Sequence, residues 1–152
     1  MGAEPVRLEL YGRPAGRRPS ERATLLLLSV ADGLRQGLST VLQRHDVTLA
    51  QYNVMRVLRD APPEGLPTLV AGEQLIEHAP GITRMMDRLE ARGWVTRTRS
   101  TEDRRQVLCS LTATARELVD ALQEPMARAM ESGLAGLSPE QQRQLTVLLA
   151  AL

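Results

Sequence analysis

The chain has 152 residues, of which 43% are hydrophobic, and this is enough for one packed domain. Its net charge of +1 does not by itself point to nucleic acid, and all 19 basic residues are arginines. The single cysteine excludes an internal disulfide, and no metal-ligand cluster, paired carboxylates or nucleophile–base pattern indicates a metal, a cofactor or an enzyme. No apolar segment looks long enough for a signal peptide or a bilayer crossing, so we expect a cytoplasmic protein with no membrane partner.

The N-terminal part of the chain predicts a loose arm followed by a long helix. Residues 1–19 carry four arginines among glycines and prolines, which is typical of a disordered terminus, with a basic arm on phosphates as the alternative. Over residues 20–44 apolar side chains recur at helical spacing, and Leu27, Leu34 and Val41 lie seven apart. This stripe fits either a helix buried against a partner subunit or an ordinary core helix.

Two shorter helices are predicted next. Thr48 begins the first of them, with Gln51 three residues later to complete a capping box. The proline- and glycine-rich segment Asp60–Pro67 then predicts a loop. After this loop Thr68 is expected to cap a short helix that runs to about Glu77.

A third short helix and a hairpin follow. Pro80 suits the first position of the helix and Gly93 its end. Alternation of apolar and polar residues over 94–99 predicts a strand, which pairs with a second strand at 107–111 across the charged turn 100–105. The inner face of the helix is predicted to consist of Ile82, Met85, Met86 and Leu89.

The C-terminal part predicts two more helices. The first begins at Thr112 or Thr114 and contains Pro125, which should kink it. The second begins at Ser138, where proline and a capping-box glutamine follow in the expected positions. Its buried side is predicted to consist of Leu145, Leu148, Leu149 and Leu152.

This order of elements predicts a mainly α (α+β) fold with about six helices and a two-stranded wing. The short helix and the hairpin cannot form a core alone, so they are expected to pack on the helices before them as a winged helix-turn-helix. The long helices at the two ends of the chain then remain for packing and for dimerisation.

Basic residues are concentrated in the short helix and the hairpin, although the whole chain is nearly neutral. Residues 84–105 contain seven arginines and four acids. A recognition helix contacts bases with its N-terminal part in the major groove, where Arg84 and Arg88 can bond guanine. Arg104 or Arg105 at the hairpin tip can enter a narrow minor groove. The alternative is a solvated charged helix with a salt-bridged turn.

The segment PGITRMMDRLEARGWVTR, followed by STEDRRQVLCSLT, resembles the MarR family of bacterial transcriptional regulators. The resemblance covers a single domain at 20–152, after a flexible arm at 1–19. It implies dimerisation helices at 20–45 and 112–152, and a winged helix-turn-helix DNA-binding unit at 48–111. It also implies a homodimer, a pseudo-palindromic operator and, commonly, a small ligand that releases the DNA.

The residues and the resemblance together assign the DNA-binding site to the start of the recognition helix and the tip of the wing. Backbone donors at the helix start favour a phosphate there, and in the family's wing pair Asp103 is expected to orient Arg105. The assigned residues are Pro80, Gly81, Thr83, Arg84, Arg88, Asp103, Arg104 and Arg105. Three departures from the family pattern, at Ala79, Trp94 and Ala115, remove none of these contacts.

We therefore expect a homodimeric, sequence-specific repressor whose partners are double-stranded DNA, a second copy of the chain and a small-molecule effector of unknown identity. The alternative is a winged-helix module that binds protein and not DNA. Cys109, in the second wing strand, is expected to be a buried small residue rather than a redox sensor. Peroxide-sensing members of the family usually carry their cysteine near the first helix, and this chain has none there.

Overall fold

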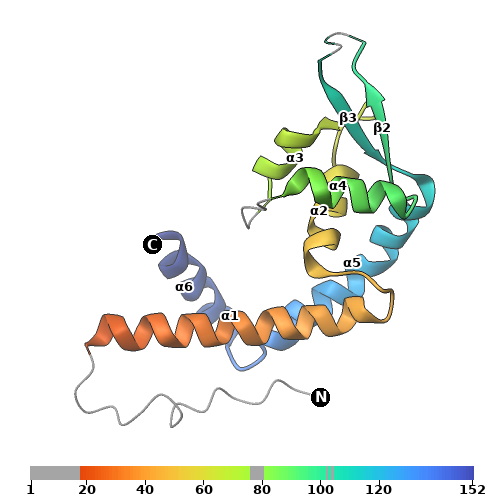
Figure 1. Cartoon of the computed structure of the whole chain (residues 1–152). Helices are drawn as coiled ribbons and strands as arrows, with labels where there is room; N and C mark the ends of the chain where they lie inside the picture. The colour runs from red at the N-terminus through yellow and green to blue at the C-terminus, as the bar shows by residue number, and fades with distance from the viewer. Residues whose placement is uncertain (1–17, 76–80, 102, 104) are drawn as a thin grey trace. The chain divides into compact units, whose positions relative to one another are not determined.

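The computed structural model describes residues 18–75, 81–101, 103 and 105–152. Within these residues the chain forms six helices and a three-stranded antiparallel sheet, which confirms the predicted mainly helical fold (Figure 1). The elements are α1 (Pro19–Gln43), α2 (Leu49–Arg59), β1 (Leu66–Pro67), α3 (Thr68–Glu73), α4 (Ile82–Ala91), β2 (Val95–Arg99), β3 (Val107–Leu111), α5 (Ala113–Gly133) and α6 (Pro139–Ala150).

These elements belong to two compact units. The central unit is Leu42–Glu124, and the terminal unit is Met1–Val41 together with Pro125–Leu152. The division falls inside α5, at the proline that interrupts its sequence. The predicted division of labour, with dimerisation helices at 20–45 and 112–152 and DNA binding at 48–111, stays a prediction. The arm predicted at 1–19 lies almost wholly outside the described residues.

Both predicted capping boxes are present. The Thr48 hydroxyl accepts a hydrogen bond from the Gln51 backbone N–H at 3.2 Å, and the Gln51 side chain accepts one from the Thr48 N–H at 2.9 Å. Ser138 and Gln141 form the same reciprocal pair at 3.3 and 2.8 Å. Each box satisfies two backbone donors that the first turn of a helix would otherwise leave without partners.

Helix α4 begins later than predicted and ends where predicted. Its N-cap is Gly81, whose φ of 95° places it in the left-handed region, and the helix proper starts at Ile82. Pro80, the predicted first position, lies outside the described residues. At the other end Gly93 has a φ of 68° and donates its N–H to the Glu90 carbonyl at 2.8 Å, as glycine does just after a helix.

The wing strands pair in antiparallel register, with Val95 opposite Leu111 and Arg99 opposite Val107. The sheet also contains a third strand, β1, which pairs with β3 and lies at the end of the segment predicted as a loop. Two residues are too few to give an alternating pattern, so the sequence carried no signal for this strand.

The predicted cap of α3 was wrong. The N-cap of that helix is Pro67, no side chain caps it, and Thr68 is already its first residue. The Thr68 hydroxyl instead lies 3.3 Å from the sulfur of Cys109, across the contact between α3 and β3. Pairing of β1 with β3 brings these two residues together, and helix-capping statistics contain no information on that contact.

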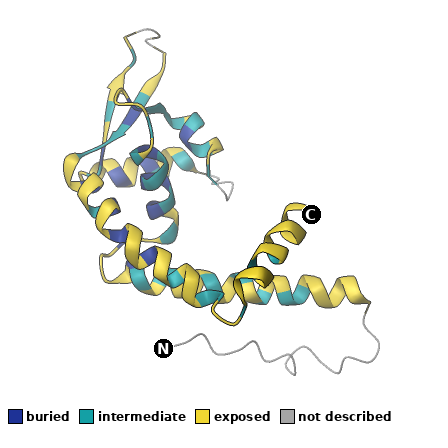
Figure 2. Ribbon diagram, turned by 180° about the vertical axis from the view of Figure 1, so that it is seen from behind, coloured by how far each residue is buried: buried dark blue, intermediate teal, exposed yellow. Residues whose placement is uncertain are grey.

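The core of the central unit lies where α2, α3, α4 and the sheet meet. Figure 2 shows the buried residues concentrated in this unit. Its fully buried side chains include Met55 and Leu58 from α2, Met86 and Leu89 from α4, and Cys109 from β3. Met86 and Leu89 confirm the predicted inner face of α4, on which Ile82 and Met85 are half-buried.

A polar connection ties α2 to the first half of α5. Arg59, at the end of α2, forms a hydrogen-bonded ion pair with Asp120 on α5. Arg116, one turn earlier on α5, donates to the Arg59 backbone carbonyl at 3.0 Å. These contacts position the last turn of α2 against α5.

Gly65 is the glycine at which the central unit tolerates a side chain least. Its φ is 95°, and an added Cβ would lie 2.6 Å from the Cys109 carbonyl oxygen and collide with the Ser110 side chain. We expect Gly65→Ala to lower the free energy of unfolding by about 1–3 kcal/mol from backbone strain alone. Thermal unfolding measures the loss, at about 2–4 °C per kcal/mol for a chain of this size.

Gly33→Ala is the matched control for this substitution. Gly33 lies within α1, and nothing lies within 4 Å of the position where its Cβ would be. Alanine there should be neutral or add about 0.5–1 kcal/mol of stability, because glycine is a poor helix former. Equal melting temperatures for Gly65→Ala and the wild type would contradict the steric argument.

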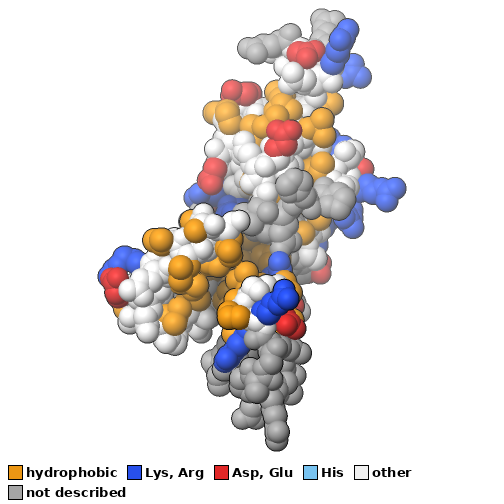
Figure 3. All heavy atoms as spheres, turned by 90° about the vertical axis from the view of Figure 1, so that its left-hand side faces the viewer, with side chains coloured by type: hydrophobic (Ala, Val, Ile, Leu, Met, Phe, Trp, Pro, Cys, Tyr) orange, Lys and Arg blue, Asp and Glu red, His pale blue; other side chains and the backbone are white. Residues whose placement is uncertain are grey.

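In the terminal unit much of the apolar surface is not covered by the chain itself. Leu28 of α1 is 61% exposed, and Val147 and Leu148 of α6 are 70% and 67% exposed. The predicted buried side of α6 is therefore wrong for a single chain, because no residue of that helix is buried. Figure 3 shows hydrophobic side chains on the surface of both helices in the lower part of the view.

Helix α1 is also long and apolar enough, by length and composition alone, to cross a membrane, with a mean hydropathy of 1.2 over 18 residues. The expectation that no segment is long and apolar enough for a bilayer crossing was therefore wrong. Helices that are covered by other parts of a protein can be equally apolar, and within this chain only 6% of the 18-residue segment is buried. The sequence pattern that predicted a dimerisation helix is the same apolar stripe.

Candidate nucleic-acid interface

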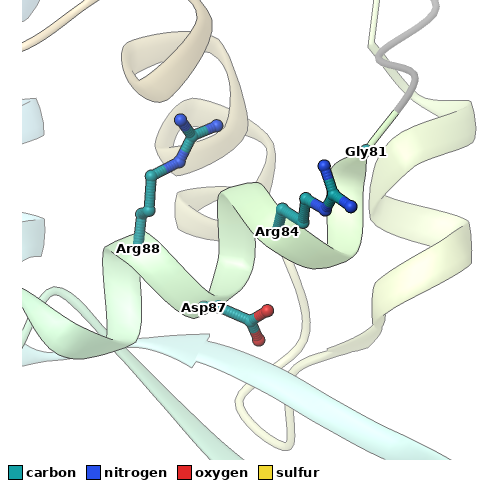
Figure 4. A pocket seen from close by; sticks show the side chains of 4 residues that line it. All are labelled: Gly81, Arg84, Asp87 and Arg88. Atoms are coloured by element: carbon teal, nitrogen blue, oxygen red, sulfur yellow. The ribbon is translucent and has the colours of Figure 1, made fainter.

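The outward face of α4 carries two arginines on the same side of the helix. Arg84 and Arg88 are four residues apart, exposed, and line a surface hollow together with Gly81 and Asp87 (Figure 4). Both guanidinium groups extend from one side of α4, whereas the Asp87 carboxylate points away from them. Neither arginine has an ion pair or hydrogen bond with another described residue. Their donors therefore remain available for a ligand.

The first turn of α4 adds backbone donors to this face. Gly81 has no side chain, and no side chain of the described residues caps the helix. Thr83 lies in this first turn and is exposed. Uncapped N–H groups and the positive end of the helix dipole favour an anion at this position.

The acids of α4 are held by an arginine from the wing. Arg97 of β2 places Nη1 2.7 Å from the Asp87 carboxylate and Nε 3.6 Å from the Glu90 carboxylate. Its Nη2 donates to the Thr83 carbonyl at 3.4 Å. Burial lowers the pKa of the Arg97 guanidinium, but the hydrogen bond and charge of Asp87, with the charge of Glu90, outweigh burial and raise that pKa.

The wing turn is organised by Asp103. Its carboxylate accepts a hydrogen bond from the Arg105 backbone N–H at 3.0 Å and another from the Gln106 side chain at 3.2 Å. The Asp103 N–H in turn donates to the Ser100 hydroxyl at 3.2 Å. Asp103 thus contacts the main chain of Arg105, rather than its guanidinium, among the described atoms. Arg105 is exposed at this turn.

A further arginine is used to fasten the end of α4. Arg92 forms an ion pair with Asp46 at 2.9 Å and donates to the Asp46 carbonyl at 2.7 Å. Its guanidinium also lies 3.8 Å from the centre of the Trp94 ring, a cation–π contact. Asp46 has a φ of 54°, so Arg92 holds a turn in an unusual backbone conformation. Arg92 therefore stabilises the unit and does not extend the basic face.

The structure thus brings together four of the eight assigned residues on α4 and its cap: Gly81, Thr83, Arg84 and Arg88. It places Asp103 and Arg105 separately, at the wing turn. Pro80 and Arg104 lie outside the described residues. The ion pairs of Arg97 with Asp87 and Glu90 were not predicted from the sequence, in which Arg97 is one of the seven arginines of residues 84–105. The sequence did contain one indication of these pairs. Asp87 and Glu90 are three residues apart on the helix, and Arg97 lies on the strand that follows it.

Among the described residues this surface carries neither an exposed cysteine nor a metal-binding cluster. Cys109 is buried with no exposed surface, as expected for a small core residue. Among the described histidines, cysteines and acids, no group of three or more is placed to hold a metal ion.

A three-helix unit, a basic helix with a free start and an antiparallel hairpin beside it define a winged helix-turn-helix. A model of the MarR family matches residues 47–107, which includes α2 to the start of β3. The organic hydroperoxide resistance transcriptional regulator of Bacillus subtilis is 34% identical over 112 residues, which are 74% of this chain and 71% of that protein. The chain belongs to the MarR family of DNA-binding transcriptional regulators.

Two further similarities extend over more of the chain. The homoprotocatechuate degradative operon repressor of Escherichia coli is 26% identical over 126 residues, or 83% of this chain and 84% of that one. The structure of Bordetella bronchiseptica BpsR, whose DNA binding is regulated by 6-hydroxynicotinic acid, superposes with a TM-score of 0.76 at 25% identity. This similarity covers 90% of the chain and 96% of BpsR.

Proposed function

We propose that this regulator is a homodimeric repressor that binds a pseudo-palindromic operator, with α4 in the major groove and the wing in the flanking minor groove. The observation that carries the proposal is the pair of exposed, unpaired arginines, Arg84 and Arg88, on one side of α4. Arginine can bond guanine through two parallel hydrogen bonds, which requires a guanidinium that no acid already occupies.

The remaining assigned residues support contacts that position the protein on the duplex. The free start of α4 at Gly81 and Thr83 suits a phosphate, and Arg105 on the shaped turn suits a narrow minor groove. Pro80 is kept in the proposed site because it matches the family's recognition helix, and Arg104 because of its place in the charged turn of the wing. Contacts of this kind fix register and orientation, while Arg84 and Arg88 supply sequence preference.

The homodimer is supported by the apolar surface that α1 and α6 leave uncovered. Exposed apolar area of this extent on helices indicates a protein contact. A twofold arrangement of two α4 helices would place them in successive major grooves, about 10 bp apart. The same twofold symmetry requires an operator with inverted half-sites. Membership of the MarR family also supports a cytoplasmic location for the protein, together with its DNA.

Repression and release by a small molecule are proposed from the relatives. The Escherichia coli relative is the repressor of the homoprotocatechuate degradative operon, and the DNA binding of BpsR is regulated by 6-hydroxynicotinic acid. If an effector releases this protein from DNA, operator and effector must weaken each other's binding by the same factor. The buried state of Cys109 gives no support to thiol-based control like that of a peroxide sensor.

The alternative of a winged-helix module that binds only protein finds no support, because the family binds DNA. Selection of bound sequences from random duplexes tests the proposal. We expect enrichment of two inverted half-sites whose centres are about 10 bp apart. An enriched site without twofold symmetry would contradict the homodimer, and absence of any enrichment would contradict sequence-specific binding.

A further inference from the structure

We propose that Arg97 is a positioning residue for DNA binding, which pairs with the two acids of α4 and so leaves the positive charge of Arg84 and Arg88 dominant on the face of this helix that meets DNA. The proposal deepens the proposed function and rests on it. Arg97 would act through Asp87 and Glu90, without contacting the operator, and would thereby determine how strongly Arg84 and Arg88 attract DNA.

Helix α4 by itself has no net charge. It carries two arginines, Arg84 and Arg88, and two acids, Asp87 and Glu90. Asp87 lines the same hollow as the two arginines and is half exposed. An unpaired carboxylate at this position would repel the phosphates that the neighbouring arginines attract.

The wing supplies the cation that pairs with these acids, the guanidinium of Arg97. One guanidinium reaches both carboxylates and the Thr83 carbonyl, which no residue of α4 itself does. The Asp87 carboxylate points away from the guanidinium groups of Arg84 and Arg88 (Figure 4), and its ion pair with Arg97 holds it in that position. A carboxylate held in this way is unable to pair with either arginine, so their donors remain free.

Arg97 is itself poorly placed to contact a phosphate. Its side chain is only 22% exposed, and its Nε is buried without a hydrogen-bond partner, 3.6 Å from the Glu90 carboxylate. Arg99, two residues further along the same strand, is exposed and is better placed to contact solvent. Arg97 therefore belongs to the support of the recognition helix.

A cycle of three variants tests this role: Arg97→Gln, the acid-free pair Asp87→Asn with Glu90→Gln, and the combination of all three. Affinity is measured by fluorescence anisotropy on the selected operator duplex and on a mixed-sequence duplex at low salt. Arg97→Gln should weaken binding about tenfold or more, because it exposes two carboxylates to the phosphates. The acid-free pair should bind at least as tightly as the wild type.

The combination of all three substitutions decides between mechanisms. If Arg97 acts by neutralising the acids, its loss in the acid-free background should change affinity by no more than about twofold. An undiminished loss in that background would show a direct DNA contact and overturn the proposal. Weakened binding by the acid-free pair alone would show that the ion pairs matter only as a structural tie, which would also overturn it.

Arg92→Gln is the matched control, because it removes another arginine that is ion-paired within the central unit, on the far end of α4. It should leave affinity near the wild-type value, and thermal unfolding monitors any loss of stability in each variant. The mixed-sequence duplex separates the two hypotheses. If selection yields no preferred site, the proposed function fails, while the cycle on this duplex still decides the role of Arg97.

Discussion

Replacing Arg84 by alanine is expected to change which operator base the protein prefers, as well as how tightly it binds. Arg84 lies in the first turn and a half of α4, is exposed, and has no described partner to lose within the chain. A bidentate arginine–guanine pair is worth about 1–3 kcal/mol of discrimination. This corresponds to about 5- to 150-fold for each half-site, and a dimer loses the contact twice.

The measurement is repeated selection from random duplexes, followed by titration of the wild-type site and its single-base variants at one fixed salt concentration. We expect Arg84→Ala to lose preference at one position of each half-site and to retain it elsewhere. A uniform loss on every sequence would reduce Arg84 to a phosphate contact. Since no described intramolecular contact is removed, the melting temperature should stay unchanged.

Arg105→Ala is the variant to compare with Arg84→Ala, because it should lower affinity without changing base preference. Arg105 lies on the wing turn, whose shape depends on a backbone hydrogen bond to Asp103 rather than on the arginine side chain. Its removal should weaken binding and lower the salt dependence by about one counterion for each half-site, or about two for the dimer, with the base preference set by α4 retained. Unchanged affinity would remove the wing from the proposed interface.

The elements that the sequence predicted well are those decided within a few neighbouring residues. The capping boxes at Thr48 and Ser138, the glycine end of α4 and the alternation of the wing strands depend on local spacing, and all of them are present. Each involves hydrogen bonds or side-chain periodicity within one element or across one turn. These features therefore depend on neighbouring residues and not on how distant parts of the chain pack together.

The features that the sequence did not predict depend on contacts between distant residues. Strand β1 exists because Leu66 and Pro67 lie beside β3, about forty residues later, and Thr68 contacts Cys109 for the same reason. Asp87 and Arg97 are ten residues apart with a glycine turn between them, so only the packing of α4 on β2 brings them together. Charge counting along the chain therefore overestimated the basic surface, because it treated Arg92 and Arg97 as free.

The same limitation explains the incorrect expectation for α6. Its leucines follow a helical period, and periodicity identifies an apolar face without identifying what covers it. Within one chain Leu148 and Leu149 stay 67% and 44% exposed. Burying a leucine stabilises by about 1.5–3 kcal/mol, so a second copy that covers this face would gain what the single chain does not.

Replacing both Leu148 and Leu149 by glutamate should therefore convert the dimer to a monomer and remove operator binding. A dimer binds its second half-site as an intramolecular step, which raises affinity by about 10²–10⁴ over a single half-site. The double variant should sediment as a monomer at micromolar concentration. On the full operator it should bind about as weakly as the wild type does on a single half-site.

Thr146→Glu is the control, because it adds a negative charge to the same helix at an exposed position that carries no leucine. It should remain dimeric and bind the operator. Circular dichroism distinguishes loss of pairing from loss of folding, since neither leucine is buried within the chain. A dimeric double variant with wild-type affinity would exclude this face of α6 from the interface. A monomeric variant with wild-type affinity for the full operator would instead separate DNA binding from pairing, and two α4 helices would no longer be required for recognition.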